Sequence, residues 1–188
     1  MNTNTPGTVR HFTLKVTLLG VEPPVWRRFR VPGSCTLLQL HQILQVLMDW
    51  QDMHLHDFQI GERYFGRPTT EEDADFLADE RDHRLDHLVK RVGTRIRYRY
   101  DFGDDWRHEI RVERIGDAAP GGAAVECLDG ARAGPPEDCG GPPGYEILRR
   151  ILAEPGRPEF ADVREAYESF DPERFDLAGI NRQLRAFR

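Results

Sequence analysis

Hydrophobic and polar positions alternate along the first part of the chain. Between residues 11 and 18 every second side chain is apolar: Phe12, Leu14, Val16 and Leu18. This alternation predicts a strand with one buried face. Two consecutive prolines, Pro23 and Pro24, end the strand, and a second strand is predicted over residues 25–31.

The pattern then changes from alternating to helical. Thr36 and Gln39 have the spacing of a capping box, in which each side chain binds a free backbone N–H group. Apolar residues follow at intervals of three and four positions: Leu40, Ile43, Leu44 and Leu47. We therefore predict a helix over residues 37–48 that buries this stripe against a sheet.

Three further strand-forming stretches follow, at residues 54–60, 63–65 and 95–115. The last of these predicts a hairpin, because apolar and charged residues alternate on both sides of the turn sequence at 101–105. A shift of one residue would bury the arginines. The register is therefore predicted to place Tyr98 opposite His108 and Arg97 opposite Glu109.

The remaining segments are predicted to be loops and helices. We expect residues 1–9 to be disordered and predict flexible loops at 67–82 and 116–124. Amphipathic spacing predicts three C-terminal helices, at residues 145–153, 159–170 and 177–187. The order of elements favours one α+β domain over residues 1–188, with a mainly antiparallel sheet, helices packed on one face and a helical C-terminal segment.

Composition agrees with a folded domain outside the membrane. Of the 188 residues 39% are apolar and 31% charged, and no apolar run approaches the roughly 18 residues of a membrane span. No signal segment is recognisable, so we expect a cytoplasmic protein. The three cysteines, Cys35, Cys127 and Cys139, show no C-x-x-C spacing and are expected to stay reduced. The net charge is −6, and residues 71–82, with seven acidic groups and one arginine, account for it.

Arginine is concentrated on the predicted outer face of the sheet. The residues concerned are Arg27, Arg28, Arg30, Arg95, Arg97, Arg99, Arg107 and Arg111. Arginine interleaved with aromatic residues such as Trp106 is typical of surfaces that bind a nucleic-acid backbone. We therefore expect a non-catalytic interaction module without a cofactor, whose partner is nucleic acid or a mobile-element protein. A solvated face of cross-strand ion pairs is the alternative.

Histidines suggest a second hypothesis. His54 and His56 share one face of a predicted strand, and His108 lies on the apolar face of another. Three such histidines are suited to bind a divalent metal such as zinc, with Cys127, Cys139 or Asp104 completing the set. The protein would then be a metal-dependent hydrolase. The alternative is that these are partly buried histidines bound to backbone groups or carboxylates.

The loop at residues 134–144, GPPEDCGGPPG, has a defined shape because proline restricts φ and glycine permits positive φ. It leads into a predicted helix. Glu137 and Asp138 either occupy the positive end of that helix or contact a ligand or partner. Both interpretations stay open, and the two residues are included among the candidate binding residues.

Six segments in order resemble the plasmid pRiA4b ORF-3-like proteins. They are LKVTLLGVEPPVWRRFRVP, TLLQLHQILQVLMDW, HLHDFQIGERYFG, YRYDFGDDWRHEIRVE, GARAGPPEDCGGPPGYEIL and FDPERFDLAGINRQL. The resemblance implies an α+β domain, common in bacteria, archaea and their mobile elements, with no established activity. Some members carry the label resolvase. Serine-recombinase chemistry requires a nucleophilic serine, and Ser34 and Ser169, the two serines here, are expected at a turn and at a helix end.

The resemblance assigns no catalytic residue. Members often carry cysteine where this chain has Gly134. If that cysteine belongs to a metal or redox site, this chain is expected to lack the site.

Overall fold

The computed structural model describes residues 10–117, 124–154 and 156–187, so the predictions for 1–9 and for the centre of 116–124 lie outside it. The strands are β1 (Arg10–Leu18), β2 (Trp26–Pro32), β3 (His56–Ile60), β4 (Arg63–Gly66), β5 (Leu77–Asp79), β6 (Arg95–Tyr100), β7 (Trp106–Asp117) and β8 (Glu126–Ala131). The α-helices are α1 (Leu37–Met48), α2 (Glu71–Phe76), α3 (Leu85–Leu88), α4 (Gly141–Ala153), α5 (Ala161–Ala166) and α6 (Leu177–Leu184). Short 3₁₀ helices are η1 (Glu80–Asp82), η2 (Pro158–Phe160) and η3 (Arg185–Phe187).

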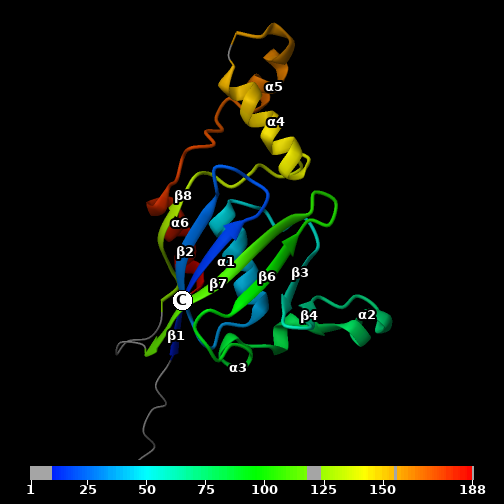
Figure 1. Cartoon of the computed structure of the whole chain (residues 1–188), viewed down its shortest axis with the longest axis vertical. Helices are drawn as coiled ribbons and strands as arrows, with labels where there is room; N and C mark the ends of the chain where they lie inside the picture. Colours follow the sequence, from blue (N-terminus) through cyan, green and yellow to red (C-terminus); the bar gives the residue numbers. More distant parts are fainter. Residues whose placement is uncertain (1–9, 118–123, 155, 188) are drawn as a thin grey trace, which may run out of the picture.

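The described strands form one sheet in the order β5-β4-β3-β6-β7-β1-β2-β8. Every neighbouring pair is antiparallel except β4 and β5. The predicted hairpin is confirmed in β6 and β7, where Tyr98 pairs with His108 and Arg97 with Glu109. Helix α1 packs on one face of the sheet, and the opposite face is turned toward the viewer without a helix over it (Figure 1). The α+β prediction is therefore confirmed.

Helix α1 forms as its sequence predicts. The Thr36 hydroxyl accepts a hydrogen bond from the Gln39 N–H at 3.2 Å, and the Gln39 side chain accepts one from the Thr36 N–H at 3.0 Å. The predicted apolar stripe is almost fully buried: Leu40, Ile43, Leu44 and Leu47. Asp49, in the left-handed region at φ 62°, ends the helix.

The acidic segment is more structured than we predicted. In place of a flexible loop, residues 71–82 form α2, β5 and η1. The Glu80 side chain is 2% exposed and binds His56 Nε2 at 2.7 Å. The acidic composition suggested solvation throughout, whereas this one carboxylate is buried because it has a histidine partner. Strand β8 was also missed, because its residues contain Asp129 and Gly130 and form a strand only by pairing with β2.

The C-terminal helices are largely as predicted. Helix α4 begins at Gly141, earlier than expected, since prolines are tolerated in a first helical turn. The predicted helix at 159–170 is shorter and comprises η2 and α5. Asp176 caps α6 by accepting a hydrogen bond from the Gly179 N–H at 2.8 Å. Helices α4 and α5 lie beyond one end of the sheet (Figure 1). None of the described helices is both long and apolar enough to cross a membrane.

Candidate functional site

The open face of the sheet carries the arginines that alternation predicted. Arg95 and Arg97 of β6 are exposed, and the Arg99 side chain is 41% exposed. Arg99 forms an ion pair with Asp57 at 2.5 Å, and Arg95 forms one with Glu109 at 3.5 Å. Arg97 lies opposite Glu109 in the register but binds Gln59 Oε1, at 3.2 Å. No carboxylate of the described residues forms an ion pair with Arg97.

A hollow of about 530 Å³ lies over this face. The residues that line it are Leu19, Asp57, Gln59, Tyr64, Arg97, Tyr98, Arg99, Arg107 and His108. Beside it the exposed ring of Phe102 lies 4.2 Å from the Arg99 guanidinium carbon. Strands β3, β4, β6 and β7 and the turn after β6 therefore bring arginines and exposed aromatic rings together.

Two residues predicted for this surface are buried in the core. Arg27 is 2% exposed and Trp106 is fully buried. Successive strand residues point to opposite faces, so Arg27 points inward while Arg28 points outward. The run of arginines in β2 had obscured this alternation. Arg28 stays on the open face and forms an ion pair with Glu113 at 2.6 Å.

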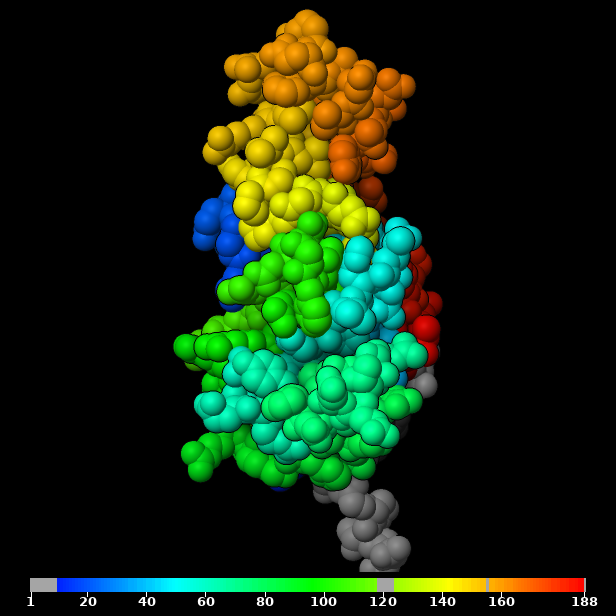
Figure 2. Space-filling model, turned by 90° about the vertical axis from the view of Figure 1, so that its right-hand side faces the viewer, coloured from blue at the N-terminus to red at the C-terminus, as the bar shows by residue number. Residues whose placement is uncertain are grey.

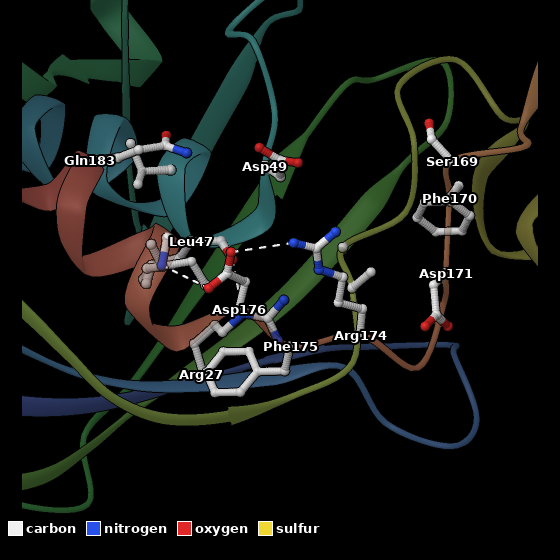
Figure 3. A pocket seen from close by; sticks show the side chains of 15 residues that line it. Arg27, Leu47, Asp49, Ser169, Phe170, Asp171, Arg174, Phe175, Asp176 and Gln183 are labelled. Atoms are coloured by element: carbon white, nitrogen blue, oxygen red, sulfur yellow. Dashed lines mark hydrogen bonds and ion pairs between the residues drawn. The ribbon is translucent and has the colours of Figure 1, made fainter.

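Arg27 instead borders a cavity of about 240 Å³ (Figure 3). Its guanidinium group donates hydrogen bonds to the carbonyl oxygens of Leu47, Trp26 and Ala131, at 2.8–2.9 Å. It also lies 4.9 Å from the centre of the Phe175 ring. Burial lowers the pKa of Arg27 to about 10. These contacts join β2 to α1, β8 and the C-terminal segment, so they indicate a structural role.

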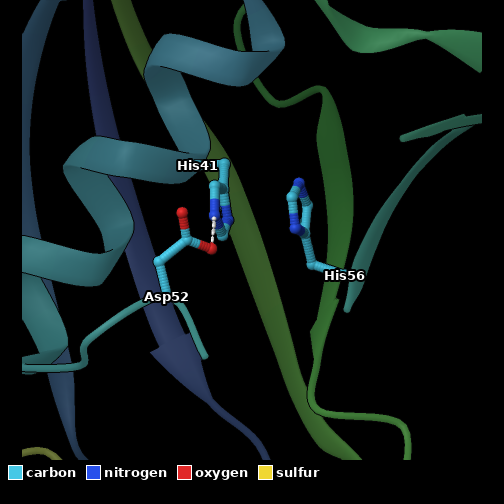
Figure 4. Close-up of side chains that lie close together, drawn as sticks. All are labelled: His41, Asp52 and His56. Carbon is cyan, nitrogen blue, oxygen red and sulfur yellow. Dashed lines mark hydrogen bonds and ion pairs between the residues drawn. The ribbon is translucent and has the colours of Figure 1, made fainter. Parts of the chain in front are cut away.

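A second group of polar side chains is buried between α1 and β3. His41 Nε2 lies 2.7 Å from Asp52 Oδ1, and His41 Nδ1 lies 2.8 Å from the Tyr98 hydroxyl. The rings of His41 and His56 stack with their centres 3.4 Å apart and their planes 3° from parallel (Figure 4). His41 was not among the candidate residues, although it stands four residues after Leu37 and four before Gln45, on the buried side of α1.

This stacked pair is unsuited to hold one metal ion. The nitrogen lone pairs of an imidazole lie in the ring plane, and two parallel planes 3.4 Å apart share no point. Each ring also has one nitrogen bound to a carboxylate, Asp52 for His41 and Glu80 for His56. We therefore interpret this group as a hydrogen-bonded network within the core.

The predicted trio of metal-ligating histidines does not come together. His56 joins the stacked pair, while His108 lies between Trp50 and Tyr98 with ring centres 5.4 and 5.3 Å away. His54 precedes β3, so it does not share a strand face with His56. Its Nε2 atom lies instead 3.0 Å from Asp138 Oδ1, 3.7 Å from Asp101 Oδ2 and 4.0 Å from Glu137 Oε2.

A family model described as plasmid pRiA4b ORF-3-like protein matches residues 10–179. The chain belongs to this family. An uncharacterised protein, y4hQ from Sinorhizobium fredii (strain NBRC 101917 / NGR234), is 40% identical over 169 residues, which covers 89% of this chain and 84% of the relative. The crystal structure of MM3350, a protein of unknown function from Methanosarcina mazei Go1, superposes with a TM-score of 0.82 at 33% identity. That match covers 91% of this chain and 97% of the other.

Neither of these names specifies an activity, so membership of the family supports the fold and leaves the chemistry to the residues. Gly134 is the position at which the family resemblance led us to expect a cysteine. A Cβ atom at this position would lie 2.0 Å from the carbonyl oxygen of Met48. The backbone here therefore requires glycine, and a cysteine would need a local rearrangement.

Proposed function

We propose that the protein binds single-stranded nucleic acid on the open face of its sheet. The observation that carries this proposal is the hollow of about 530 Å³ lined by Arg97, Arg99 and Arg107. Three guanidinium groups around one concave surface offer positive charge to a phosphodiester backbone, where each neutralised phosphate releases a counterion. The function is that of a binding module.

Arg97 is the central residue of this proposal. Asp57 and Asp105 partly neutralise Arg99 and Arg107, at 2.5 and 2.7 Å. Within the part of the chain that the structure describes, the side-chain partner of Arg97 is the neutral amide of Gln59. Its charge is therefore available to a phosphate group without the breaking of an ion pair.

Exposed rings favour a single strand over a duplex. Tyr64 and Phe102, 45% and 46% exposed, lie on or beside the hollow. Unpaired bases stack on such rings, whereas the bases of a duplex are already stacked on each other. The net charge of −6 argues against strong non-specific attraction and favours recognition confined to this face.

The proposal predicts that Arg97→Ala weakens binding and lowers its salt dependence. Loss of one phosphate contact reduces the slope of log K against log salt by roughly 0.7 for a single strand. The measurement is a fluorescence anisotropy titration of labelled oligothymidine and oligouridine at several salt concentrations. The free energy of unfolding should change by less than about 1 kcal/mol, because the side chain is exposed.

Arg150→Ala is the matched control, since Arg150 is 72% exposed on α4 and the substitution removes the same charge. It should leave both affinity and slope unchanged. An equal loss of affinity in the two variants would indicate non-specific electrostatic attraction. If the wild type does not bind at protein concentrations on the order of tens of micromolar, the proposal is refuted.

A further inference from the structure

One imidazole nitrogen in this protein is surrounded by three carboxylate groups. His54, from the loop before β3, faces Asp101 of the β6–β7 turn and the pair Glu137 and Asp138 of the loop before α4. Figure 2 shows these three segments together, the cyan loop and the green turn beside the yellow start of α4. Three parts of the chain that are distant in sequence therefore build this group.

In two of these carboxylates, one oxygen accepts hydrogen bonds from neighbouring groups, and the second oxygen of the same carboxylate is directed at His54. Asp101 Oδ1 accepts hydrogen bonds from the N–H groups of Gly103 and Asp104, at 2.9 and 3.3 Å. Glu137 Oε1 accepts hydrogen bonds from the Tyr100 hydroxyl and the Gln51 N–H, both at 2.9 Å. Neighbouring groups thus orient each carboxylate, as the supporting residues of metal ligands do.

The atoms directed at one another have no hydrogen-bond partner. His54 Nε2 and Glu137 Oε2 are both buried from solvent and unpartnered among the described residues. Nε2 lies 3.0 Å from Asp138 Oδ1, but the geometry of that contact is not that of a hydrogen bond. A buried nitrogen that is close to oxygen without donating to it is the arrangement expected when both atoms donate lone pairs to a third atom.

The charges of the group are also unbalanced. Across the described residues, no lysine or arginine forms an ion pair with Asp101, Glu137 or Asp138. The side chain of Asp101 is 10% exposed and that of Glu137 is 12% exposed, so water screens these carboxylates poorly. Burial of uncompensated negative charge is strongly unfavourable, and a bound cation would remove that cost.

We propose that His54, Asp101 and Asp138 bind one divalent transition-metal ion, with Glu137 beside it. Bonds of about 2.0–2.2 Å to zinc place neighbouring tetrahedral ligands about 3.4 Å apart, which is close to the 3.0 and 3.7 Å found here. The ligand atoms of the three residues all lie within 4.8 Å of one another. An imidazole nitrogen with carboxylate oxygens suits Zn²⁺ or Mn²⁺.

The proposed site is open on one side. Asp138 is 66% exposed, so a fourth position faces solvent. Cys139 is not part of this group, because its sulfur is not among the ligand atoms that all lie within 4.8 Å of one another. Asp104 Oδ2 accepts a hydrogen bond from the Gly140 N–H at 3.1 Å and supports the loop.

The test is equilibrium dialysis of the full chain, stripped with chelator, against Zn²⁺ and against Mn²⁺, with bound metal measured by elemental analysis. The wild type should bind one ion per chain. His54→Gln should weaken binding at least on the order of a hundredfold, since it removes a ligand rather than a supporting group. Circular dichroism of each variant checks that it is folded.

Two matched substitutions separate this site from the rest of the chain. Asp138→Asn should lose the ion, whereas Asp52→Asn, in the stacked histidine network, should keep it. Both aspartates have φ near 55°, which asparagine tolerates equally. A second control, His87→Gln at an exposed histidine, should bind the metal ion as the wild type does. Full binding by folded His54→Gln, loss of the ion in Asp52→Asn, or no stoichiometric binding by the wild type would each overturn the proposal.

Discussion

At the scale of single residues, the buried network around Tyr98 allows one arrangement of protons. Burial, together with the nearby His56, lowers the pKa of His41 to about 4, so the ring is neutral near pH 7. The Asp52 carboxylate can only accept a hydrogen bond, so the proton of the neutral His41 ring is on Nε2 and is donated to Asp52. His41 Nδ1 therefore accepts from the Tyr98 hydroxyl at 2.8 Å, and that hydroxyl accepts in turn from Gln45 Nε2 at 3.2 Å. Every member of the network is thereby satisfied.

Removal of the central hydroxyl should therefore be costly. Tyr98→Phe leaves the Gln45 amide and His41 Nδ1 buried without a partner, which predicts a loss of about 1–3 kcal/mol in the free energy of unfolding. Urea denaturation measures it. Tyr64→Phe removes the same group from a residue that is 45% exposed and should have little effect. Equal stability of the two variants would show that the network contributes nothing.

At the scale of elements, the fold depends on the contact between α1 and the sheet. The helix has a buried apolar stripe, and the inward residues of β1, β2, β6 and β7 form the other side of the core. Leu44 and Leu47 are fully or almost fully buried on this helix. The same contact positions the loop before β3, because His54 follows α1 by a few residues.

We expect Leu44→Ala to lower the free energy of unfolding by about 2–5 kcal/mol, since it removes a fully buried side chain and leaves a cavity. Gln42→Ala, at an exposed position of the same helix, is the control for helix propensity. Denaturant unfolding compares the two. A change below about 0.5 kcal/mol in Leu44→Ala would contradict the packing described.

At the scale of the whole molecule, buried neutral histidines link stability to pH. Burial lowers the pKa of His108 to about 4, as it does for His41, against about 6.5 in the unfolded chain. The unfolded state therefore binds protons more readily between these values. The contribution of each histidine to the free energy of unfolding is fully present above about pH 6.5 and is lost as the pH falls toward 4.

The protein should accordingly lose up to about 3 kcal/mol of stability for each of these histidines between about pH 7 and about pH 4. Denaturant unfolding at a series of pH values measures the loss. His108→Leu, which has no titrating group in the core, should show a shallower dependence than the wild type. His87→Gln, at a side chain that is 67% exposed, should follow the wild type. An unchanged slope in His108→Leu would exclude His108 as a source.

Local patterns predicted much of the fold. The alternation in β1, β6 and β7 and the capping box at Thr36 depend on neighbouring residues, and each is found where expected. Strand β8 and the burial of Glu80 were missed, because each depends on a partner that lies far away in the sequence. Arg27 was misplaced for a different reason, since its own alternation with Phe29 already indicated an inward position.

The sequence by itself determined the class of fold, the faces of the main strands, the position of α1 and the row of arginines on the open face of the sheet. It did so because side-chain direction follows from the backbone period within one element. Only the tertiary structure decided which polar groups meet. His54 was a candidate from the start, but its neighbours Asp101 and Asp138 come from separate turns. Their approach depends on how the loops at one end of the sheet pack, and no local pattern encodes that.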